Sequence, residues 1–167
     1  MEKPQVDLIL FADEEQRLTG LLERLCSEAK GRAAFLIDRN GRLVAASGET
    51  EGLDTTSLSS LVAGSIAATG SLAQLIGEVE FTGLFLGGEE SHLYIAVVEE
   101  RLILVVLFDR NTSVGLVRFR VTQIREEIGR ALADFADQSL GSGASPTGVR
   151  AELAQITDED IENLLSI

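Results

Sequence analysis

Apolar residues spaced three or four positions apart give the first regular pattern in the chain. They are Leu18, Leu21, Leu22, Leu25 and Ala29. The stripe follows acidic residues 13–15 and ends before Lys30-Gly31. Negative charge at the start and positive charge at the end suit the helix dipole, so the pattern predicts an amphipathic first helix.

Five short apolar runs predict strands. They cover residues 33–37, 43–46, 79–86, 92–98 and 102–108. The first two flank Asp38-Arg39-Asn40-Gly41, where asparagine and glycine suit the positive φ of a hairpin turn. The last run is apolar on both faces over residues 102–107, which is typical of a central strand.

Two further segments have helical character. Residues 55–77 contain no charged residue, and Asp54 or Thr55 can cap their start. The third helix is predicted from a stripe at 3.6-residue spacing: Val117, Val121, Ile124, Ile128, Leu132 and Phe135. The order α-β-β-α-β-β-β-α predicts an α/β (α+β) fold, in which helices cover both faces of a five-stranded, mostly antiparallel sheet.

Composition shifts suggest the limits of one domain. We expect a flexible N-terminus over residues 1–11, the domain over 12–138, and a glycine- and serine-rich linker over 139–149. Residues 150–167 are acidic and predict a short helix that Thr157 can cap. Its apolar stripe, Ile161, Leu164 and Leu165, is too short to hold a helix alone, so we expect it to dock on a partner. A disordered, solubilising end is the alternative.

Charge and composition exclude several classes of function. With 27 acidic residues against 14 Lys and Arg, the chain carries a net charge of −13, so nucleic acid is not an expected partner. One cysteine and one histidine cannot by themselves form a disulfide or a structural zinc site, and no metal or cofactor is expected. Because the N-terminus lacks the pattern of a secretory signal, we expect a cytoplasmic protein.

No catalytic constellation is apparent in the sequence. Lys3 and Lys30 do not follow a glycine-rich loop, so the chain is not itself a P-loop GTPase. His92 could act as a base only if a nucleophile and an acid lay beside it, and a strand-edge side chain is the favoured interpretation. We therefore predict no catalytic residues and a protein that is not an enzyme.

The second helix carries an unusual face. A helical projection assigns Leu58, Leu61, Val62, Ser65, Thr69, Leu72, Ala73 and Ile76 to the sheet side. The opposite face holds only small or uncharged residues: Ser60, Ala63, Gly64, Ala67, Gly70, Ser71 and Gln74. Interior glycine destabilises a helix by about 1 kcal/mol relative to alanine, so close approach of another backbone would explain it.

Three interpretations of this face stay open. A membrane-spanning helix is disfavoured by its many Ser, Thr and Gln residues, so membrane insertion is not expected. The helix could instead be buried between layers of its own chain. A protein interface, through self-association or a partner, is the interpretation that we favour.

Several segments together resemble the roadblock/LC7 family. These segments are 35–38 with Gly41, 54–58 through 75–78, 104–109 with 112–118, and the acidic tail. The resemblance implies a roadblock/LC7 sandwich that forms a homodimer through its second helix and third strand. Such a dimer would bind a small Ras-like GTPase of the MglA type in a 2:1 complex over the paired second helices.

The resemblance also implies an activity for the complex. The dimer would act as a GTPase-activating protein without an arginine finger, in cell polarity or motility control at a cell pole. The residues of the small face are not divided between the dimer contact and the GTPase contact. A non-catalytic scaffold, or a partner that promotes nucleotide exchange on the same GTPase, is the alternative.

Overall fold

The computed structural model describes residues 12–141. Its elements follow the predicted order: α1 (Ala12–Ala29), β1 (Ala33–Asp38), β2 (Leu43–Gly48), α2 (Thr55–Leu75), β3 (Leu84–Gly87), β4 (Ser91–Val98), β5 (Leu102–Asp109) and α3 (Val114–Gly141). The chain divides into two compact units, Met1–Leu132 and Ala133–Ile167, and the whole sheet belongs to the first. The predicted α+β class is confirmed.

The five strands form one antiparallel sheet in the order β2-β1-β5-β4-β3. As predicted, β5 is a central strand, buried between β1 and β4. β3 pairs only with β4, from Leu84 opposite Ile95 to Gly87 opposite His92, so its other edge is free among the described residues.

The third strand is shorter than predicted. The expected strand over residues 79–86 begins only at Leu84. The Arg39 guanidinium binds the Glu80 carboxylate at 3.0 Å and holds the preceding segment toward the β1–β2 turn. Gly83 lies directly against the Tyr94 ring, where a Cβ would overlap the phenol, and glycine weakens a strand interior. These local contacts replace the ladder that the apolar pattern predicted.

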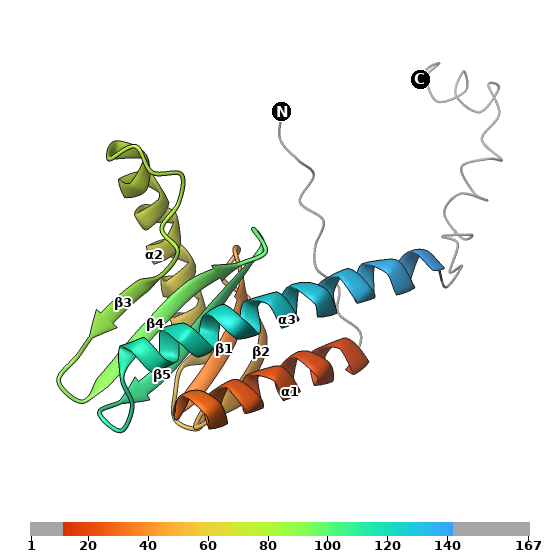
Figure 1. Ribbon diagram of the computed structural model, residues 1–167, viewed down its shortest axis with the longest axis horizontal. Coiled ribbons are helices and arrows are strands. Elements are labelled where there is room, and N and C mark those ends of the chain that lie inside the picture. Colours follow the sequence, from red (N-terminus) through yellow and green to blue (C-terminus); the bar gives the residue numbers. More distant parts are fainter. Residues whose placement is uncertain (1–11, 142–167) are drawn as a thin grey trace, which may run out of the picture. The chain divides into compact units, whose positions relative to one another are not determined.

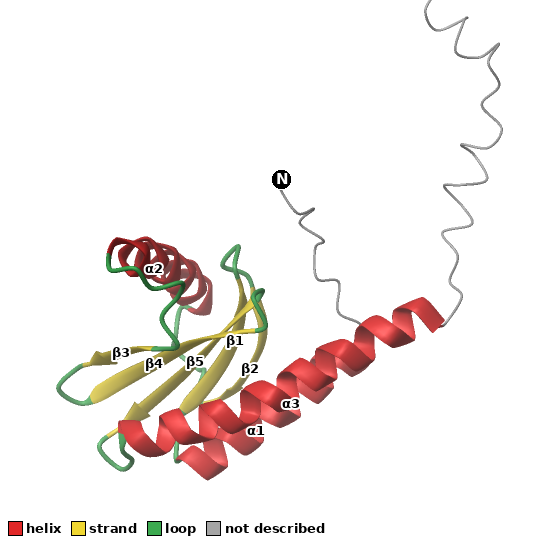
Figure 2. Cartoon of the chain, turned by 45° about the horizontal axis from the view of Figure 1, so that its top comes forward, coloured by secondary structure: helices red, strands yellow, loops and turns green. Residues whose placement is uncertain are grey.

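The helices cover opposite faces of the sheet. α1 and α3 lie on one face and α2 lies on the other (Figures 1 and 2). Val62 and Ile66 of α2 pack on a cluster of buried strand residues: Ala33, Phe35, Ile37, Ile95, Val97, Ile103 and Val105. Each large apolar side chain buried in this way contributes roughly 1.5–3 kcal/mol to folding.

The β1–β2 turn supports α2. The buried Asp38 carboxylate accepts the backbone N–H groups of Asn40 and Arg42, each at 2.9 Å, and pairs with the Arg42 Nε at 2.9 Å. Gly41 follows with a φ of +84°, and a Cβ there would lie 3.0 Å from the Cα of Ser60. The turn therefore requires glycine both for its backbone conformation and for close approach to α2.

Candidate functional site

Both ends of α2 are fixed by local hydrogen bonds. Asp54 is the N-cap, because its carboxylate accepts the Ser57 N–H at 3.0 Å and the Ser57 hydroxyl at 2.6 Å. These bonds, the hydroxyl first, hold the pKa of Asp54 below its usual value. At the other end Gly77 has a φ of +80°, and the Glu78 N–H reaches the Ala73 carbonyl at 3.0 Å, as in a Schellman motif.

α2 carries two apolar stripes. The first, Val62, Ile66 and Ala73 with half-buried Leu58, faces its own chain. The second is between 54% and 83% exposed and comprises Leu61, Leu72, Leu75 and Ile76. Val79, at 94% exposed, follows directly after the helix. We call Leu61, Leu72, Leu75, Ile76 and Val79 the exposed apolar set.

The prediction for Leu61, Leu72 and Ile76 was wrong. These residues were expected on the sheet, and the structure exposes them to solvent. The C-terminal half of α2 rises clear of the strands (Figure 1), so only part of the helix has its own sheet beneath it. Helical periodicity finds apolar stripes, but it cannot tell which stripe the chain itself covers.

The predicted small face is only partly exposed. Ser60, Gly64, Ala67, Ser71 and Gln74 are exposed. The other two residues are half-buried: Ala63 packs on the core beneath α2, and Gly70 lines a small pocket with Phe81 and Leu84. A Cβ added at Gly64 or at Gly70 would meet nothing within 4 Å, so packing within the described chain does not require either glycine.

Four hydroxyl groups of α2 are satisfied by the helix itself. Ser59, Ser65, Thr69 and Ser71 donate to the carbonyl four residues earlier, at 2.7, 2.9, 2.6 and 3.4 Å. A partner can therefore cover these residues without leaving a polar group unpaired. By length and composition alone, α2 could also cross a membrane, a test that core helices of soluble proteins also pass.

An apolar groove lies between the start of α2 and the β3–β4 turn. Its volume is about 420 Å³, and it is lined by Phe35, Leu53, Leu58, Leu86, Gly87, Gly88, Ser91, Leu93 and Leu107. Leu86, in the edge strand, is itself 44% exposed. Sequence reasoning missed this groove because its lining comes from four strands, α2 and two loops that lie far apart in the sequence.

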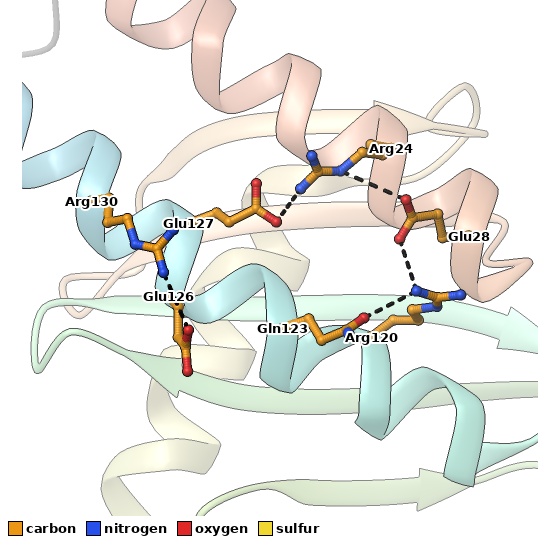
Figure 3. Close-up of polar contacts among 7 residues, drawn as sticks. All are labelled: Arg24, Glu28, Arg120, Gln123, Glu126, Glu127 and Arg130. Atoms are coloured by element: carbon orange, nitrogen blue, oxygen red, sulfur yellow. Dashed lines mark hydrogen bonds and ion pairs between the residues drawn. The ribbon is translucent and has the colours of Figure 1, made fainter.

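A charged network joins the other two helices. Arg24 of α1 binds Glu127 of α3, and Arg120 of α3 binds Glu28 of α1 at 3.3 Å (Figure 3). The hydrogen bond between Arg24 and Glu127 lowers the pKa of Glu127 and raises that of Arg24. Each arginine is matched by a carboxylate, so the cluster joins α1 to α3 and leaves little net charge for a ligand.

The candidate catalytic groups are not assembled into a site. The His92 ring lies 5.8 Å from that of Phe85 and 5.3 Å from that of Phe108, in an aromatic cluster. Burial raises the pKa of the Cys26 thiol to about 11, so it is protonated at neutral pH and is a poor nucleophile. Within residues 12–141, no group of three His, Cys, Asp or Glu side chains could hold a metal ion.

The fold and the comparisons agree on the class of protein. Residues 19–108 match the model of the Roadblock/LC7 domain, and the chain belongs to that family. Among solved structures it is similar to MglB of Myxococcus xanthus, with 41% identity over 76% of this chain and 96% of that one and a TM-score of 0.71.

Two further solved structures carry the same name. The gliding protein MglB of Thermus thermophilus is 30% identical over 78% of this chain and 99% of that one, with a TM-score of 0.71. An MglB with a tetrameric arrangement is also 30% identical, over 78% of this chain and 98% of that one, with a TM-score of 0.72. Among curated proteins, no sequence matches.

Proposed function

We propose that the chain regulates a small Ras-like GTPase of the MglA type, without a catalytic site of its own. The observation that carries this proposal is the exposed apolar set of α2, which leads toward the edge strand β3. Single exposed apolar side chains are ordinary, whereas a contiguous group marks an interaction surface. Similarity to MglB proteins at 30–41% identity supports the same role.

The regulator acts as a homodimer in this proposal. The free edge of β3 offers unpaired backbone groups, and a second β3 can pair with it antiparallel about a two-fold axis. The C-terminal half of α2, which rises clear of its own strands, would then lie over the partner sheet. Leu72, Leu75 and Ile76 would fill the apolar groove beside Leu86 of the second copy, and the reverse contact would form by symmetry.

The paired helices would form one surface for the GTPase, which gives the 2:1 stoichiometry. The exposed small residues Ser60, Gly64, Ala67 and Ser71 would let a switch region approach the helix backbone closely. Because α2 contains no charged residue, it has no arginine to insert into a nucleotide site. Activation would instead come from holding the GTPase in one switch conformation with its own catalytic residues in place.

The remaining assignments extend this proposal. The predicted tail helix with Ile161, Leu164 and Leu165 lies outside the described residues, and we propose that it makes a second contact on the GTPase. Residues 139–141, which we expected to begin the linker, belong to α3. The rest of the predicted linker also lies outside the described residues. We further propose that the complex acts in the cytoplasm, at a cell pole, in polarity or motility control.

GTP hydrolysis by an MglA-like GTPase, measured with and without this chain, tests the proposal. Light scattering on the same mixture reports the stoichiometry. We expect faster turnover and two copies of this chain per GTPase. Binding without a change in the rate of hydrolysis would favour the scaffold alternative, and faster nucleotide release would favour exchange promotion. If the two proteins do not bind, a GTPase of the MglA type is not the partner.

A further inference from the structure

The first half of α3 is basic in an otherwise acidic chain. Residues 110–125, from the loop before α3 into the helix, contain four arginines and no acidic residue, whereas the whole chain has a net charge of −13. The four are Arg110, Arg118, Arg120 and Arg125. Glu126 is the next acidic residue, and it pairs with an arginine one turn further along the helix. The sign of the charge is therefore reversed over this segment alone.

Two of the four arginines are held by the chain itself. Arg110 donates to a backbone carbonyl of the β3–β4 turn at 3.0 Å, and Arg120 forms an ion pair with α1 at 3.3 Å. In the part of the chain that the structure describes, no hydrogen bond or ion pair is found for the side chains of Arg118 and Arg125. These two guanidinium groups carry positive charge that no carboxylate of the fold offsets.

The exposed side of α3 combines these two arginines with apolar area. At about 100° per residue, one arc of the helix holds five side chains: Val114, Arg118, Phe119, Thr122 and Arg125. Phe119 is 55% exposed and Val114 is 38% exposed. The Thr122 hydroxyl donates to the Arg118 carbonyl at 2.9 Å, so a partner could cover it without leaving it unpaired. We call these five residues the α3 basic surface.

The other sides of this part of α3 are covered by the fold. Val117, Val121 and Ile124 are buried. Arg120 and Glu127 point the other way and bind α1 (Figure 3). Because α1 and α3 lie on the sheet face opposite α2 (Figures 1 and 2), a partner on the α3 basic surface would leave α2 accessible.

We propose that the α3 basic surface binds an acidic amphipathic helix of a second protein. Arg118 and Arg125 are seven residues apart, or about 10.5 Å along the helix at ~1.5 Å per residue, and acidic residues seven positions apart on a partner helix have the same spacing. The planar guanidinium group binds a carboxylate through two parallel hydrogen bonds. Apolar residues between the two carboxylates would cover Phe119 and exclude water from both ion pairs.

Charge favours a protein partner over an anionic membrane. Clusters that recognise anionic lipids contain roughly 4–8 basic residues, whereas this surface has two free arginines. An anionic bilayer would also repel the rest of a chain whose net charge is −13. A peptide helix contacts only the local surface, and at physiological salt the charges beyond ~8 Å are largely screened from it.

A synthetic peptide helix tests the surface on the full-length chain. It carries glutamates at positions i and i+7 and leucines at i+3 and i+4, and a scrambled peptide of the same composition is its control. In ¹⁵N spectra, we expect the first peptide to shift the amide signals of residues 114–125 most strongly. Signals of the exposed α1 residues Glu15 and Glu23 should not move. The scrambled peptide should bind about tenfold more weakly or less.

Charge reversal gives the matched variants. Arg118→Glu with Arg125→Glu should weaken binding of the acidic peptide by about tenfold or more. A peptide with lysines in place of the two glutamates should then shift residues 114–125 of this variant, which also shows that the variant is folded. Arg17→Glu with Arg101→Glu makes an equal change in net charge at exposed positions outside the surface, and it should bind the acidic peptide as the wild type does.

Several outcomes would overturn the proposal. They are the absence of shifts with up to about 1 mM peptide, shifts confined to other surfaces, and unchanged binding by the Arg118→Glu, Arg125→Glu variant. Phosphatidylglycerol vesicles that bind the chain through these two arginines, when the peptide does not, would show that the ligand is a lipid surface. No GTPase takes part in the experiment, so this contact can fail while the proposed regulation holds, and it can form while that regulation fails.

Discussion

Gly41 shows how a single residue supports α2. Its φ is +84°, and its Cα is so close to α2 that a Cβ would lie 3.0 Å from Ser60. Gly52 has a similar φ of +79°, but nothing lies within 4 Å of a Cβ there. A comparison of substitutions at these two glycines therefore separates the effect of backbone strain from the effect of contact with α2.

We expect Gly41→Ala to lower the free energy of unfolding more than Gly52→Ala does. A strained backbone conformation costs roughly 1–3 kcal/mol in either variant. Only the variant at position 41 adds a clash with the α2 backbone. Urea denaturation of both variants measures the difference, and equal losses would show that the turn does not press on α2.

The cap of α2 predicts a dependence of stability on pH. Hydrogen bonds from Ser57 lower the pKa of Asp54 in the folded state, so its stabilising effect is present above the unfolded pKa of about 3.9 and is lost as pH falls further. Asp54→Asn keeps a good cap that does not titrate. Unfolding midpoints measured between neutral and acidic pH should therefore fall less for Asp54→Asn than for the wild type.

At the scale of elements, one substitution in α2 is expected to change fold stability and association in opposite directions. Replacing a helical glycine with alanine stabilises a helix by about 0.5–1 kcal/mol when the space is free, as it is at Gly64. We expect Gly64→Ala to raise the melting temperature but to weaken binding of the GTPase, because a methyl group would keep the other backbone away. Gly20→Ala in α1, also in open space, is the control.

The two outcomes at Gly64 are distinguishable. The control variant should be stabilised without a change in GTPase affinity in a titration. If Gly64→Ala binds as tightly as the wild type, close approach at this position is not the reason for the glycine.

The elements also show how far sequence patterns reach. The order of elements and the central position of β5 follow from local patterns, and the structure confirms them. Of the two predicted cap candidates, Asp54 and Thr55, the cap is Asp54. The late start of β3 could not be predicted from local patterns, because Arg39 and Glu80 are 41 positions apart and their contact forms only in the fold. The face of α2 was misassigned because Leu61 and Val62 both belong to apolar stripes and only tertiary packing decides which one is buried.

At the scale of the whole molecule, the exposed apolar set is the surface through which we propose that the dimer forms. Leu75 is 83% exposed at the end of α2, so replacing it should leave the fold of the single chain intact. In the proposed dimer it would lie in the groove of the second copy. A charge buried there without a counterion would strongly oppose association.

We therefore expect Leu75→Glu to shift the protein from dimer to monomer in light scattering, with at least a tenfold weaker self-association, or about 1.4 kcal/mol. Circular dichroism should stay unchanged. Phe119→Glu, which alters a 55% exposed residue of α3, should remain a dimer. Because the proposed GTPase surface needs two paired helices, Leu75→Glu should also lose GTPase activation; a monomer that still activates would separate the two contacts and place the GTPase on a single α2.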